Sequence, residues 1–199
     1  CIEHILEELM NAKKLMANHL ETSYIENLGN GKFKMTALPL KTQFAPVFGM
    51  LTGDFNHDQF LDVLIVGNFF GNNPFWGKID ALNGLFLAGK GNGQFEMLEY
   101  PHSGFLVPGD AKAIVDIPLN MGENFILVSQ NQDSIKTFTS KYSGKMIDLK
   151  SNDIYVDIVF PDGSRRKHEF YFGNTYLSQT ARLFRLPENV KTYKIHSLE

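Results

Sequence analysis

The chain has 199 residues, of which 43% are apolar and 13% aromatic, so it is long enough to bury a sizeable hydrophobic core. Its 19 basic and 22 acidic side chains give a formal net charge of -3, a balance that argues against nucleic acid or an anionic membrane as the main partner. A single cysteine, Cys1, excludes an intramolecular disulfide, and no apolar run reaches the ~20 residues of a membrane-spanning helix.

The first segment, residues 1–21, has the pattern of an amphipathic helix. Over residues 2–20 the apolar side chains recur mostly at steps of three and four, at Ile2, Ile5, Leu6, Leu9, Met16 and Leu20. This spacing predicts one helix. A lone terminal Cys1 is typical of a domain boundary, with the lipid-modified first residue of a mature bacterial lipoprotein as the alternative.

The second segment, residues 22–140, contains an internal repeat of β-hairpins. Residues 24–39 match residues 86–101 at an offset of 62, with six identical positions at Gly29, Asn30, Gly31, Phe33, Met35 and Pro39. Each copy predicts two strands joined by a tight Asn-Gly turn. Repeated hairpins at this spacing predict the antiparallel four-stranded blades of a partial β-propeller, with residues 67–80 as an inserted loop. A third such unit is expected over residues 104–140.

The third segment, residues 141–199, predicts a β module built around a hairpin. The alternating strand at 154–160 is followed by the turn Pro161-Asp162-Gly163 and a returning strand that includes "KHEFYF". The boundary with the second segment is expected within residues 141–150. The fold class is therefore mainly β, with an N-terminal helix and a C-terminal hairpin module.

The stretch "GDFNHDQFLD" at residues 53–62 places oxygen-bearing side chains at every second position. A loop of this kind supplies the ligands that calcium prefers, and the candidates are Asp54, Asn56, Asp58, the backbone carbonyl of Phe60, and Asp62. An EF-hand is excluded because Ile65 stands where its last glutamate is needed. Gln59 departs from the pattern, because such loops favour glycine at this position and a left-handed conformation of Gln59 would cost about 1 kcal/mol. The alternative is a solvated acidic turn without an ion.

Two stretches resemble known families. "GDFNHDQFLDVLIVGN" followed by "GKGNGQFE" resembles the FG-GAP or VCBS repeat, the calcium-binding blade of integrin-like β-propellers. "VDIVFPDGSRRKHEFYFGNTYLSQTAR", with Tyr176-Leu177-Ser178-Gln179 as its most specific part, is similar to the ASPIC/UnbV domain. The first resemblance implies the same five ligands, from Asp54 to Asp62. Because a closed propeller needs four to eight blades, it also implies a larger parent protein or self-association.

Aromatic and basic side chains are further binding candidates. Phe69, Phe70, Phe75 and Trp76 in the inserted loop are expected either to pack between blades or, if exposed, to contact a sugar or a protein, with Phe70, Phe75 and Trp76 as the contact residues. Arg165, Arg166 and Lys167 follow the turn of the last hairpin. They predict a solvated hairpin tip, with contact to an anion or polysaccharide as the alternative.

These features favour a non-catalytic, calcium-stabilised β-propeller segment that acts in adhesion or in glycan or protein recognition. Millimolar calcium outside the cytosol, together with the resemblance, predicts a secreted or bacterial envelope location, in the periplasm or on the surface. The alternatives are a structural capping piece of a larger propeller and a polysaccharide-degrading enzyme. An enzyme would need a converging acid and base, with candidates at Asp80, Glu96, Asp110 and Asp116.

Overall fold

The computed structural model describes residues 13, 15–119, 122–141, 144–173 and 181–198. Within these ranges the protein is mainly β, and its helical turns are η3 (Leu40–Gln43) and α1 (Tyr100–Ser103). The predicted helix over residues 2–20 is not seen, because residues 13 and 15–20 are not helical and the others lie outside the described residues. Cys1 also lies outside them. No helix in the described ranges has the length and apolar character needed to cross a bilayer.

The first sheet is an isolated antiparallel hairpin of β1 (Ser23–Gly29) and β2 (Lys32–Ala37). Its turn residues Asn30 and Gly31 have φ angles of 51° and 71°, as a tight two-residue hairpin turn requires. The hairpin predicted for residues 24–39 is therefore confirmed. Gln43 ties its base to the rest of the chain, since the Gln43 Oε1 accepts the N–H of Thr22 at 2.7 Å.

Two larger sheets follow the hairpin, and in each the neighbouring strands are consecutive in the chain. The four-stranded antiparallel sheet contains β3 (Val47–Gly53), β4 (Asp62–Gly67), β5 (Leu85–Gly89) and β6 (Phe95–Leu98). The pair β5–β6 confirms the second predicted hairpin. The three-stranded sheet contains β7 (Ala111–Pro118), β8 (Glu123–Gln130) and β9 (Lys136–Lys141).

The C-terminal module contains two small antiparallel sheets. One pairs β10 (Lys145–Asp148) with β13 (Leu183–Leu186), and the other has the order β12 (Arg165–Glu169), β11 (Asp153–Val159), β14 (Thr192–Ser197). The predicted C-terminal hairpin is confirmed by the pairing of β11 with β12. A separate core of Val156, Ile158, Phe184 and Leu186 supports the module.

The four-stranded sheet is apolar on both faces. One face carries Leu64 and Phe86 and packs on the three-stranded sheet, where it meets Ile114 and Val128. The close approach requires Gly49, because a Cβ there would press against the side chains of Val66 and Ile114. The opposite face forms a second core of Ala45, Ile65, Leu82, Leu85 and Leu87. Sheet-on-sheet packing of alternating apolar residues therefore stabilises this part of the fold.

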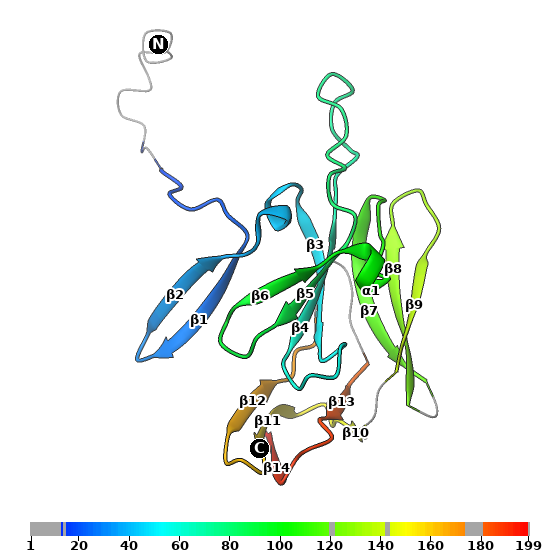
Figure 1. The fold of residues 1–199 in the computed structure, drawn as a ribbon. Helices are drawn as coiled ribbons and strands as arrows, with labels where there is room; N and C mark the ends of the chain where they lie inside the picture. The colour runs from blue at the N-terminus through cyan, green and yellow to red at the C-terminus, as the bar shows by residue number, and fades with distance from the viewer. Residues whose placement is uncertain (1–12, 14, 120–121, 142–143, 174–180, 199) are drawn as a thin grey trace.

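Figure 1 shows how these parts are arranged. The hairpin β1–β2 projects to one side of the four-stranded sheet. Residues 68–80, called the finger below, extend from one end of that sheet between β4 and β5, and the C-terminal module lies at the other end. The described residues form no closed ring of sheets.

Candidate metal centre

Residues 54–61, called the acidic loop below, connect β3 to β4 at the end of the sheet that faces the module. Two side-chain oxygens of the loop converge on one amide. The N–H of Asp58 donates to Asp54 Oδ1 at 3.1 Å and to Asn56 Oδ1 at 3.0 Å. The Asn56 Nδ2 donates to Asp58 Oδ2 at 2.9 Å, so the three side chains form one cluster.

The backbone of the acidic loop takes left-handed conformations at two residues. His57 has φ 63° and Gln59 has φ 74°, each at a cost of about 1 kcal/mol relative to the right-handed region. Gln59 therefore takes the left-handed conformation for which such loops favour glycine. It is held by a hydrogen bond from the Gln59 N–H to Asp54 Oδ2 at 3.0 Å.

Asp62 is the first residue of β4, and its side chain is fully buried. Its Oδ2 accepts the N–H groups of Phe55 at 2.9 Å and Asn56 at 3.3 Å, and its Oδ1 accepts the N–H of Gly89 at 2.9 Å. Burial raises the pKa of the Asp62 carboxyl, the amide donors partly offset this, and the charge of Asp58 raises it further. Asp62 therefore braces the acidic loop against β5.

The five predicted ligands thus have different surroundings. Asp54, Asn56 and Asp58 lie together, whereas both carboxylate oxygens of Asp62 accept backbone amides. The N–H of Phe60 donates to Asp58 Oδ1 at 2.9 Å. Among the described residues, no group of three or more His, Cys, Asp or Glu side chains is arranged to hold a metal ion.

Arg166 reaches the acidic loop from the C-terminal module, although the sequence places it 107 residues away. Its Nη2 donates to the carbonyl of Gln59 at 2.9 Å. Burial lowers the pKa of the guanidinium, and the nearby charge of Asp54 partly offsets this effect. The sequence predicted only a solvated tip or an anion contact for this residue, because nothing local to it reveals the packing of the module on the loop.

A cavity of about 450 Å³ lies between the acidic loop and the module. Its wall includes Asp54 and Gln59 from the loop, and Arg166 and His168 from the module. Burial lowers the pKa of His168, whose ring centroid lies 5.0 Å from that of Phe184. The cavity has mixed charge and apolar surface, so it does not define one class of ligand.

The aromatic candidates of the inserted loop lie on the finger. The backbone groups of Phe69 and Ile79 form a bridge across its base, and Phe70 lies beside Lys78. Phe75 and Trp76 are 88% and 78% exposed, so of the two expected alternatives, packing between blades does not apply to them.

Three of the four carboxylates considered for an enzyme are in ion pairs with different cations. Glu96 on β6 pairs with Lys90, Asp110 before β7 pairs with Lys112, and Asp116 on β7 pairs with Arg185 at 2.7 Å. Burial raises the pKa of Asp116, and Arg185 partly offsets the increase. The fourth, Asp80, is exposed at the base of the finger.

A scan against protein-family models finds no match to the chain, and a search of the curated proteins finds none that matches.

Proposed function

We propose that the protein is a non-catalytic, calcium-stabilised segment of a β-propeller that serves as a scaffold for adhesion or for glycan or protein recognition. The observation that carries the proposal is the convergence of the Asp54 and Asn56 oxygens on the amide of Asp58, beside the Asp58 carboxylate. In this proposal the acidic loop is an FG-GAP or VCBS-like calcium loop, and the C-terminal module is an ASPIC/UnbV-like domain.

The chemistry of the cluster suits calcium. Two carboxylates and one amide carbonyl are hard oxygen donors, and calcium accepts six to eight such donors, with water completing its shell. In the proposed calcium form, the charge of the ion offsets the repulsion between Asp54 and Asp58. Asp62 remains a structural residue in this proposal, because it accepts three backbone N–H groups and so holds the acidic loop against β5.

The arrangement of the sheets supports a propeller segment. The four-stranded sheet is an up-and-down antiparallel unit, and the three-stranded sheet packs on its face in the same chain order. The hairpin β1–β2 corresponds by the internal repeat to β5–β6, the second half of such a unit. Its apolar side chains Ile25, Phe33 and Met35 are exposed, so the proposed partner is further sheet structure of a larger propeller or a second copy of the chain.

The location proposed is outside the cytosol, in the bacterial envelope or the secreted fraction. A ligand that binds only the folded state stabilises it by RT ln(1 + [L]/Kd), which is roughly 2.7 kcal/mol at 100 times Kd. Millimolar calcium outside the cell can supply that ratio for a site of moderate affinity, whereas cytosolic calcium cannot.

The test is thermal unfolding of the full chain in calcium and in EDTA. Calcium at 100 times Kd is expected to raise the Tm by roughly 5 to 10 °C. Asp58→Ala should remove this rise because it deletes one ligand and the partner of the Asn56 amide.

Asp162→Ala is the matched control. Asp162 also caps an exposed turn, with its Oδ1 accepting the Ser164 N–H at 2.9 Å, but it lies on the module hairpin. This variant should keep the full response to calcium. A native chain whose Tm is the same in calcium and EDTA would refute the proposed ion.

A further inference from the structure

The finger is anchored by a buried polar residue at its base. Asn68 is fully buried and takes φ 82°, and its Nδ2 donates to the carbonyls of Leu82 at 2.6 Å and Gly109 at 3.0 Å. Its Oδ1 accepts the N–H of Leu82 at 2.9 Å. Beyond it, Phe69 and Ile79 exchange two backbone hydrogen bonds of 2.8 and 2.9 Å. The two arms of the finger are therefore fixed to the sheet.

The tip of the finger is a single hydrogen-bonded turn. Asn73 Oδ1 accepts the N–H of Phe75 at 3.0 Å, and the Asn73 carbonyl accepts the N–H of Trp76 at 2.9 Å. The turn closes through Gly77, which has φ 73°. Phe75 and Trp76 are thus presented together by a defined backbone, with ring centroids 5.8 Å apart and ring planes at 88°.

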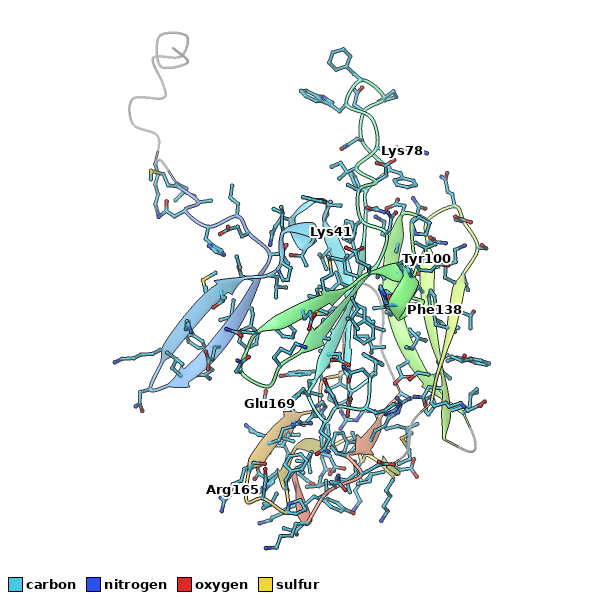
Figure 2. The ribbon with its side chains drawn as sticks, in the orientation of Figure 1. Lys41, Lys78, Tyr100, Phe138, Arg165 and Glu169 are labelled. Carbon is cyan, nitrogen blue, oxygen red and sulfur yellow. The ribbon has the colours of Figure 1, made fainter. Side chains whose placement is uncertain are left out.

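The charge pattern of the finger separates its tip from its base. Residues 68–77 contain no charged side chain. The first charge after the tip is Lys78, which Figure 2 labels on the finger. Its Nζ lies 4.6 Å from the centre of the Phe70 ring. The finger extends away from the end of the sheet, so its tip stands clear of the sheet (Figure 1).

The shape and polarity of the tip decide between three kinds of partner. A sugar ring needs a flat aromatic face with hydrogen-bonding groups beside it, but the two rings are perpendicular and Asn73 Oδ1 is used within the turn. A protein partner would need a pocket shaped to this convex pair. A bilayer interface accepts a convex, uncharged tip without a preformed pocket, and it favours tryptophan at the headgroup level and lysine behind it.

We propose that the finger inserts Phe75 and Trp76 into the interface of a phospholipid bilayer, with Lys78 at the level of the phosphates. Interfacial insertion reaches about 5 to 10 Å into the headgroup and acyl boundary, which the length of the finger allows. The acidic loop and the module lie at the opposite end of the sheet (Figure 1), so they stay in water.

The experiment uses the full chain, because Trp76 is its only tryptophan and reports directly on the tip. Phosphatidylcholine vesicles, with and without phosphatidylglycerol, should shift Trp76 fluorescence to shorter wavelength and protect it from iodide. Brominated acyl chains should quench it. Phe75→Ser should weaken vesicle binding, measured by flotation, by about tenfold, because the variant loses the favourable transfer of one aromatic ring from water into the bilayer interface.

The matched control is Phe33→Ser on β2, which removes a phenylalanine that is 62% exposed but far from the finger. It should bind vesicles like the native chain, and both variants should keep the native Tm. The proposal is overturned if neither vesicle changes Trp76 fluorescence, or if Phe33→Ser weakens flotation as much as Phe75→Ser. A fluorescence change with oligosaccharides and none with vesicles would also overturn it, in favour of a sugar site.

Discussion

The two copies of the repeated hairpin have the same local structure and opposite burial. Both β1–β2 and β5–β6 are antiparallel pairs joined by a turn that contains Asn-Gly. Leu87 on β5 is fully buried, whereas Ile25, the residue at the same position of β1, is 57% exposed. The local pattern therefore determines the hairpin, and the neighbouring elements determine whether its apolar face is covered.

The neighbours of each hairpin explain this difference. Strand β5 pairs with β4 along one edge and with β6 along the other, and Leu87 packs among Ile65, Leu82 and Leu85. Strand β1 pairs with β2 alone within the described residues. The apolar face of β1–β2 is thus equivalent to the face that β5–β6 buries, but within the described residues no further strand pairs with β1–β2.

One position distinguishes the two copies chemically. Gly89 on β5 corresponds to Asn27 on β1, and a Cβ at position 89 would overlap the carbonyl oxygen of Leu61. The N–H of Gly89 donates to Asp62, whereas the Asn27 Oδ1 accepts the N–H of Gly29 at 2.9 Å. Glycine therefore lets the acidic loop approach β5, and the first hairpin carries a side chain at this point.

The largest expected effect compares the two equivalent apolar positions. Leu87→Ala should lower the free energy of unfolding by about 2 to 5 kcal/mol, because it leaves a cavity in a closed core. Ile25→Ala should cost less than about 0.5 kcal/mol, as is usual for surface substitutions. Urea unfolding of both variants measures the difference. Equal losses would mean that β1–β2 is covered in solution, for example by a second copy.

Much of the β structure was predictable because its signals are local. Asn30-Gly31 specifies a turn that only left-handed residues can make, and the same reasoning located the hairpins β5–β6 and β11–β12. Residues 15–20 show the limit of periodicity. Leu15, Met16 and Leu20 are all more than 80% exposed, and an apolar stripe without a partner surface does little to stabilise a helix.

The candidate site was predictable only in part, because the spacing of its residues has two physical explanations. Asn56 Oδ1 accepts the N–H of Asp58, and Asp58 Oδ1 accepts the N–H of Phe60, so an every-second-residue pattern also builds consecutive side-chain-capped turns. The sequence named Asp62 and Arg166 as candidates but did not predict the roles that the structure gives them. The role of each depends on a distant partner, Gly89 in one case and Gln59 in the other.

The next largest effect tests the hydrogen bond between Asp62 and Gly89, which ties the acidic loop to β5 and has no counterpart in the hairpin β1–β2. Asp62→Ala should cost about 3 kcal/mol, because it removes a charged acceptor and leaves the amides of Phe55 and Gly89 without it. Asp58→Ala in EDTA is the control and should cost about 1 kcal/mol, since its hydrogen bonds are exposed. Chemical unfolding in EDTA measures both. A loss for Asp58→Ala as large as that for Asp62→Ala would contradict the bracing role.

The pH dependence of stability should also reveal the brace. Burial raises the pKa of Asp62 above its usual value near 3.8, so the folded protein binds this proton more readily than the unfolded chain. Protonation of Asp62 therefore adds to the free energy of unfolding as the pH falls through the raised pKa of the folded protein. This contribution is complete below the pKa of Asp62 in the unfolded chain.

The comparison variant for the pH effect is Asp62→Asn, which cannot titrate at this position. In EDTA, the unfolding free energy of the native chain minus that of Asp62→Asn should increase as the pH is lowered from 7 to about 4. A constant difference over this range would show that the amide donors lower the pKa of Asp62 as much as burial raises it.

The smallest effect concerns the contact between the two copies. The Tyr24 ring meets Phe95 edge to face at a centroid distance of 5.8 Å. Phe95 packs against the core that contains Leu87, so β1 touches the four-stranded sheet on the face opposite to the one by which Phe86 packs toward β7–β9. A double-mutant cycle with Tyr24→Leu and Phe95→Leu should give a coupling energy of about 0.5 to 1.5 kcal/mol. A coupling near zero would mean that β1–β2 is held only through Gln43. In that case the hairpin is attached to the rest of the protein only at its base, whereas a measurable coupling shows that β1 also packs on the four-stranded sheet through Tyr24 and Phe95.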